Sequence, residues 1–130
     1  MIQAGSFLKI IDTTGIVKVK CIKVLGNQEK VGKVGSVLRV SVRKYLTNEG
    51  LLQDTRKFAR FSTGTKHLAM VIRTKFRIKR CLGFYFQFSD NAAILINKKK
   101  NALTTRLKGP ILRELTQQKK QLLSLSKLII

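Results

Sequence analysis

The sequence predicts a mainly β fold, a small β-barrel followed by a helical C-terminal end, and three observations carry this prediction. Apolar and polar residues alternate with a period of two until about residue 100, as they do in half-buried strands. The alternation slips by one residue at Cys21-Ile22, as it does at a β-bulge where a small barrel bends. After Pro110 the apolar residues recur at helical spacing instead.

Two short strands are expected first, at Phe7–Ile11 and over residues 17–25, joined by a turn at Asp12–Gly15. In such a turn the aspartate can accept a hydrogen bond from the backbone ahead of it, and the glycine can adopt a positive φ. The second strand alternates small apolar residues with lysines, so its basic face should point outward. Its outward cations are Lys18, Lys20 and Lys23.

A third strand, Val37–Arg43, turns leucine and valine side chains to one face and Arg39 and Arg43 to the other. Residues 44–66 do not follow this periodicity. They are expected to form a surface excursion, that is, a long loop on the surface, with one short strand around Phe58–Phe61. A loop of this length in a compact domain is usually functional or disordered.

The most regular stretch, Leu68–Arg80, predicts a single long strand. At about 3.3 Å per residue this strand is longer than a small barrel needs, so its far end should project as one arm of a hairpin. Cys81–Gly83 is the expected turn of this ribbon. One face of the strand is apolar, and the other carries four cations: Arg73, Lys75, Arg77 and Lys79.

The returning arm of the ribbon places Phe84, Phe86 and Phe88 on one face. Three aligned rings could stack on RNA bases, as on open β-sheets. Packing against Phe76 and Ile78 is the favoured interpretation, because alternation on both arms already explains the aromatic triplet.

The end of the chain combines one more strand with helix. Ala92–Ile96 is the last expected strand, and the basic loop Lys98–Lys100 follows it. Pro110 is expected in the first turn of a helix. A second short helix or docked tail, with Leu122 and Leu125 on its apolar side, should cover the barrel. An amphipathic membrane helix is the less favoured alternative, because the basic residues gather on strands and loops instead.

A formal net charge of +21 on 130 residues calls for a polyanionic partner, because like charges at this density repel each other in a compact fold. Nucleic acid is the first candidate, an anionic membrane surface the second and an acidic protein the third. At 44% hydrophobic residues, the chain is too apolar for a disordered basic tail. No apolar run reaches the roughly 18 residues that span a bilayer, so we expect no membrane insertion, and the N-terminus shows no targeting signal.

Catalysis and metal binding find little support in the sequence. Six carboxylates are scattered along the chain and His67 is the single histidine, so no acid–base pair or nucleophilic set stands at a diagnostic spacing. Cys21 and Cys81 lie too far apart for a metal motif and are expected as free thiols. We therefore expect no enzyme activity, no cofactor and no metal.

Six blocks of sequence, taken in order, carry a resemblance to a known family. They are Met1–Gln3, Asp12–Gly15, Cys21–Gly26, Val71–Lys75, Phe88–Asn97 and Thr105–Leu115. In this order and spacing they resemble the family of large-subunit ribosomal protein fourteen, the universal L-fourteen family. The resemblance covers nearly the whole chain and leaves out only the excursion at about 44–66.

The resemblance implies one ribosomal-protein domain over residues 1–130. It would consist of a small five-stranded, OB-like β-barrel over 1–109 and two short C-terminal helices over 110–130. The barrel would carry a surface insertion at about 44–66 and a protruding β-ribbon at about 73–88.

The resemblance also implies a function, that of a structural constituent of the large ribosomal subunit. The expected partners are large-subunit rRNA, small-subunit rRNA through an intersubunit bridge, and the neighbouring ribosomal proteins three and nineteen, and no homo-oligomer is expected. A ribosome silencing factor, where the organism has one, would dock near Thr105, Arg106 and Lys119. A free OB-like nucleic-acid-binding protein or translation factor is the alternative.

The expected RNA contacts are basic residues that neutralise phosphates and release counterions. They belong to the strands, the ribbon, the loop after the last strand and the C-terminal segment. They are Lys18, Lys20, Lys23, Arg39, Arg43, Arg73, Lys75, Arg77, Lys79, Arg80, Lys98, Lys99, Lys100, Arg106, Lys108 and Arg113.

Departures from the family pattern indicate a mitochondrial member. The chain has Ser36 where the family commonly has aspartate, Leu82 in place of an acidic turn, and Thr104 in place of glycine. About ten extra residues precede His67. The expected location is the mitochondrial matrix, in the mitochondrial ribosome, with another organelle or the bacterial cytoplasm as alternatives.

Overall fold

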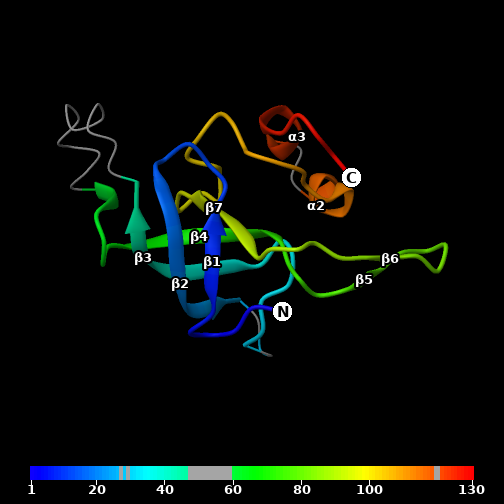
Figure 1. Ribbon diagram of the computed structural model, residues 1–130, viewed down its shortest axis with the longest axis horizontal. Helices are drawn as coiled ribbons and strands as arrows, with labels where there is room; N and C mark the ends of the chain where they lie inside the picture. Colours follow the sequence, from blue (N-terminus) through cyan, green and yellow to red (C-terminus); the bar gives the residue numbers. More distant parts are fainter. Residues whose placement is uncertain (27, 29, 47–59, 119–120) are drawn as a thin grey trace.

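Figure 1 shows the computed structural model, which describes residues 1–26, 28, 30–46, 60–118 and 121–130. Five strands close into a barrel in the order β1–β2–β3–β4–β7, which confirms the predicted mainly β fold with a five-stranded barrel. Their bounds are β1 Phe7–Ile10, β2 Ile16–Leu25, β3 Val37–Tyr45, β4 Lys66–Arg73 and β7 Ala92–Ile96. Neighbouring strands are antiparallel except β1 and β7, which pair in parallel and close the barrel.

The first hairpin shows the predicted bulge and turn. The register of β2 against β3 shifts between Cys21 and Lys23, where the alternation slips. In the turn before β2 the amide of Thr14 donates to Oδ1 of Asp12 at 3.0 Å. The other carboxylate oxygen, Oδ2, accepts a hydrogen bond from the amide of Leu95 in β7 at 3.0 Å. Asp12 therefore also ties the first turn to the last strand, a role that the sequence alone does not reveal.

The barrel wall carries apolar layers on both of its sides. The inner layer fills the barrel with buried residues from all five strands, among them Leu8, Val19, Val40, Ala69 and Leu95. The outer layer joins β4 and β7 to the C-terminal segment and includes Met70, Ile72, Ile94, Ile111, Leu112, Leu115 and Leu122. Because both of its faces are covered, β7 is buried along its whole length.

Two short helices, α2 (Arg113–Gln118) and α3 (Gln121–Leu125), supply the C-terminal part of the outer layer and lie on the same side of the barrel in Figure 1. This confirms the predicted apolar cover. The expectation that Pro110 occupies the first turn of a helix is wrong, because α2 begins three residues later. Ile111 instead forms a parallel bridge with Ile129, and its amide donates to the carbonyl of Leu128 at 3.1 Å.

The ribbon projects from the barrel, but its first arm is not the single long strand predicted over residues 68–80. β4 ends at Arg73, and only Ile78–Lys79 (β5) and Tyr85–Phe86 (β6) pair beyond it. The chain leaves the barrel where the amide of Lys75 donates to Oδ1 of Asn91 at 2.9 Å, a side-chain bond in place of a ladder bond. The turn at residues 81–83 is confirmed, since the amide of Gly83 donates to the carbonyl of Arg80 at 3.0 Å.

The aromatic residues of the ribbon divide into two groups. Phe86 and Phe88 pack edge to face, with ring centroids 4.9 Å apart, against the outer apolar layer. Phe84 and Phe76 are 69% and 51% exposed, so the prediction that they are packed with the others is wrong. Among the described residues, no second sheet packs on the ribbon to cover these two rings.

The predicted excursion at residues 44–66 lies mostly outside the described residues. Its first two residues belong to β3, and Lys66 begins β4. Arg60 and Phe61 are helical, so this part of the strand predicted around Phe58–Phe61 is wrong. Within the described ranges no helix has the length and apolar character needed to cross a membrane.

Candidate nucleic-acid interface

The outer face of β1, β2 and β3 is a surface of outward-pointing cations, here called the strand face. It consists of Lys9, Lys18, Lys20, Lys23, Arg39, Arg43 and Lys44, all exposed except the half-buried Lys20. Lys18 lies opposite Lys9 on β1 and opposite Lys44 on β3. Like charges in directly opposed positions destabilise a sheet. No carboxylate in the described part of the chain forms an ion pair with these residues.

An aromatic ring lies within the strand face. Phe7 is 49% exposed, and the Nζ atoms of Lys18 and Lys20 lie 4.4 Å and 5.8 Å from its ring centroid. Ammonium groups at these distances are attracted to the face of the ring. Phe7 was not among the predicted contacts, although its place in the alternation, two residues before Lys9, already puts it on the polar face of β1.

The predicted cations of the ribbon do not all face solvent. Lys75, Arg77 and Lys79 are exposed. Arg73 is 7% exposed, and its Nη2 donates to Oδ2 of Asp90 at 3.1 Å. The expectation that Arg73 lies in an outward row with the other three is therefore wrong. Its guanidinium has space because residue 109 is a glycine, where a Cβ atom would come within 2.5 Å of Nη1.

Arg80 is also engaged within the chain. Its Nε and Nη2 donate to the two carboxylate oxygens of Glu114 in α2 at 2.8 and 3.2 Å, and Nη2 donates to the backbone oxygen of Ile130 at 2.9 Å. Burial raises the pKa of Glu114, but its own backbone amide and the hydrogen bond and charge of Arg80 lower it more, so the pKa lies below its ordinary value.

The loop after β7 presents its lysines on a small ordered turn. Oδ1 of Asn97 accepts a hydrogen bond from the amide of Asn101 at 2.9 Å, and Lys98, Lys99 and Lys100 between them are exposed. Further along the chain the other predicted contacts, Thr105, Arg106, Lys108 and Arg113, are exposed as well. Lys119 lies outside the described residues.

Two of the pockets near this loop share part of their lining, and each has a volume of about 480 Å³. The cationic pocket is lined by the polar side chains of Arg39, Arg60, Lys66, His67, Asn97 and Lys98 and by the apolar side chains of Leu68, Ile96 and Leu103. The threonine pocket contains Thr13, Thr14, Arg60, Phe61, Thr104 and Thr105. Of these residues only Arg39, Lys98 and Thr105 were predicted as contacts. The others come from the turn before β2, from residues 60–67 and from the segment after β7, which the closed barrel brings together.

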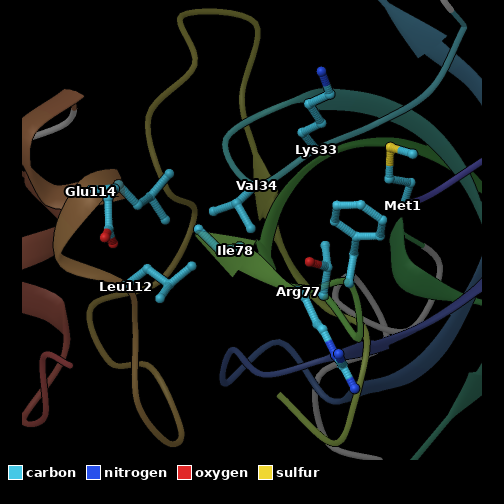
Figure 2. Close-up of a pocket in the computed structure, with 10 residues that line it drawn as sticks. Met1, Lys33, Val34, Arg77, Ile78, Leu112 and Glu114 are labelled. Atoms are coloured by element: carbon cyan, nitrogen blue, oxygen red, sulfur yellow. The ribbon is translucent and has the colours of Figure 1, made fainter. Parts of the chain in front are cut away.

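A third pocket, of about 380 Å³, is mostly apolar and lies at the base of the ribbon. Figure 2 shows Met1 and Lys33 on one side of it and Leu112 and Glu114 on the other. Glu114 is already bound by Arg80. The described residues hold no group of three histidine, cysteine or carboxylate side chains that could bind a metal ion. Cys21 and Cys81 are free thiols, as predicted.

Comparison with protein families agrees with the barrel and its basic surface. The family described as ribosomal protein L14p/L23e matches residues 1–130, the whole chain. Members of this family have a small β-barrel of this kind and are components of the ribosome. The chain belongs to the ribosomal protein L14p/L23e family, and is accordingly a structural protein of the large ribosomal subunit.

Proposed function

We propose that this protein binds large-subunit rRNA directly, with the strand face as its main contact. The observation that carries the proposal is the opposition of lysines on adjacent strands, with Lys18 between Lys9 and Lys44 and no carboxylate among the described residues to offset them. The lysines of such a surface repel one another in the free protein. The protein therefore gains stability when RNA phosphates neutralise these lysines and counterions are released.

The strand face also offers a stacking group. Because Phe7 is half exposed between two lysines, an unpaired base can stack on the ring while its phosphates meet the ammonium groups. The exposed cations of the ribbon, of the loop after β7 and of the C-terminal segment extend this contact: Lys75, Arg77, Lys79, Lys98, Lys99, Lys100, Arg106, Lys108 and Arg113. Arg73 and Arg80 act differently in this proposal, since their guanidinium groups hold the ribbon and the C-terminal segment in place.

The same proposal covers the place of the protein in the ribosome. It lies at the subunit interface, beside ribosomal proteins three and nineteen, and takes part in a bridge to small-subunit rRNA. The exposure of Thr105 and Arg106 supports a docking site for a silencing factor at this end, with Lys119 as its third member. The departures at Ser36, Leu82 and Thr104 support the mitochondrial ribosome as its location.

The test is incorporation of the tagged full chain into large subunits, followed by a high-salt wash and sedimentation. The double variant Lys18→Glu/Lys20→Glu should be lost from the large-subunit fraction, because each reversal places a negative charge against the RNA backbone. The matched control is Lys127→Glu, a reversal at an exposed lysine outside the proposed contacts. Normal retention of the double variant would contradict the assignment of the strand face.

Stoichiometry separates this function from the alternative of a free nucleic-acid-binding protein or translation factor. A ribosomal protein should co-sediment as one copy per large subunit and should not exchange with added free protein. A factor should be substoichiometric and exchange. Carrying out the sedimentation on purified mitochondria, with the cytosolic fraction beside them, tests the location in the same experiment.

A further inference from the structure

The cationic pocket is built from four separate segments of the chain. Arg39 comes from β3, Lys66 from β4, Lys98 from the loop after β7, and Arg60 from the helical residues before β4. No carboxylate lines the pocket among the described residues. Four cations around one hollow repel each other, and the group that relieves this repulsion best is a compact anion such as a phosphate.

His67 forms part of the wall of this pocket and is held in a fixed position. Its ring centroid lies 5.3 Å from that of Phe61, and its Nε2 lies 3.0 Å from Oγ1 of Thr65. Burial lowers the pKa of His67, and the charge of Arg60 lowers it further although a backbone hydrogen bond with Arg60 opposes the change. An anion entering the pocket would act on this ring, which belongs to the single histidine of the chain.

The threonine pocket shares a wall with the cationic pocket, since Arg60 and Leu103 line both. Its threonines carry hydroxyl groups, each of which can donate and accept a hydrogen bond, and that of Thr14 already donates to Oδ1 of Asp12. Oγ1 of Thr104 is buried without a hydrogen-bond partner among the described residues. A buried hydroxyl without a partner costs roughly 1–3 kcal/mol, and because Thr104 lines the pocket, rotation of its side chain toward a bound ligand would satisfy the hydroxyl and add affinity.

We propose that the two pockets together receive one unpaired nucleotide of the bound RNA, with its phosphate in the cationic pocket and its sugar or base in the threonine pocket. The inference rests on the proposed function and adds what that function does not specify, a single-nucleotide site beside the strand face. Each pocket has a volume in the range of small-molecule sites, which are roughly 300–1,000 Å³.

Paired RNA does not suit this geometry. In an A-form duplex the bases are stacked and paired, and proteins contact its phosphates and 2′-hydroxyls from outside. A hollow with cations on one side and hydroxyls on the other fits a nucleotide turned out of its stack, whose ribose and base edges are free to form hydrogen bonds. The strand face, by contrast, is an open surface that a duplex backbone can cross.

The test follows the imidazole signals of His67 by NMR in the labelled full chain, which are unambiguous because no second histidine exists. The probes are a 5′-phosphorylated RNA trinucleotide, a blunt RNA duplex and inorganic phosphate. We expect a saturable shift with the trinucleotide, at an affinity at least tenfold above that for inorganic phosphate, and no specific shift with the duplex. Equal responses to trinucleotide and duplex, or to trinucleotide and inorganic phosphate, would overturn the proposal.

Two variants and a control separate this site from the strand face. Lys66→Gln should weaken trinucleotide binding about tenfold and Thr104→Val about fivefold, in line with losing one charged and one neutral hydrogen bond. Because Thr104→Val replaces an unpartnered hydroxyl by a methyl group, it should not unfold the protein. Unchanged trinucleotide affinity in both variants would refute the nucleotide site.

The control, Lys18→Gln/Lys20→Gln, should retain the shift of the His67 signals with the trinucleotide and lose affinity for the duplex. If the control kept its duplex affinity, the strand face and thus the proposed function would fail while the nucleotide site could still stand. If the His67 shift were weakened as strongly as in Lys66→Gln, the two surfaces would be one, and the separate site would be disproved.

Discussion

The two outer faces of the barrel wall differ in what covers them. The strand face on β1 to β3 alternates cations with buried residues and stays exposed, whereas the outer face of β4 and β7 is apolar and lies under the C-terminal segment. Both belong to one closed sheet. The chain thus completes one outer face with its own residues and leaves the other exposed, so stability and the proposed RNA binding should respond to different substitutions.

The largest effect should come from the covered face. Leu115→Ala removes a side chain that is 2% exposed, from α2 in the outer apolar layer. Such truncations cost about 2–5 kcal/mol of unfolding free energy, because the cavity closes only in part. Urea unfolding followed by circular dichroism measures this loss of unfolding free energy. The control is Lys18→Ala on the strand face, whose unfolding free energy should change by no more than about 0.5 kcal/mol. Similar losses in the two variants would remove the distinction between the faces.

A somewhat smaller effect is expected at the partly buried ion pair of Arg73, at the end of β4, with Asp90. Arg73→Met leaves the carboxylate of Asp90 without its partner and should cost about 2–3 kcal/mol, less than a fully buried pair, because the Asp90 side chain is 34% exposed. The double variant Arg73→Met/Asp90→Asn should recover part of this loss, since no charge is then left unpaired. Equal stabilities of the single and double variants would show that the loss does not come from an unpaired Asp90 carboxylate.

The pair of Arg80 and Glu114 predicts a pH dependence. The pKa of Glu114 is lower in the folded chain than in the unfolded one. The ionised carboxylate therefore contributes to the free energy of unfolding above the unfolded pKa, and this contribution is lost as the pH falls through the folded pKa. Both side chains are partly exposed, and the contribution should stay below about 1 kcal/mol. Thermal unfolding between about pH 3 and pH 6 should fall less steeply for Glu114→Gln than for the unchanged chain. Parallel curves would contradict the assignment.

The smallest stability effect should have the opposite sign. Lys18→Gln removes a cation that faces Lys9 and Lys44 and should stabilise the free protein by about 0.2–0.5 kcal/mol at low salt. This gain should disappear at 1 M salt, where the Debye length is about 3 Å. For RNA binding, the same variant should reduce the slope of the logarithm of the binding constant against the logarithm of the salt concentration by about 0.9, the value for one phosphate contact. A loss of stability at low salt would show that Lys18 is not repelled by its neighbours.

The sequence predicted the barrel strands and the outward cations of β2 and β3 well, because a period of two is a local property of each strand. It failed for Arg73 and Arg80, whose partners lie 17 and 34 residues further along the chain. An alternation pattern also gives no sign that a glycine at position 109 leaves space for a guanidinium group. The pocket residues Arg60, Lys66 and His67 escaped selection because their neighbours come from other strands.

The parallel pairing of β1 with β7 has a consequence for the synthesis of this chain. Closing the barrel joins residues near the start of the sequence to residues beyond 90, and the bond between Asp12 and Leu95 spans 83 positions. Folds dominated by contacts between distant residues fold slowly. Until β7 has left the translating ribosome, β1 and β4 each keep an unpaired edge that can recruit another chain.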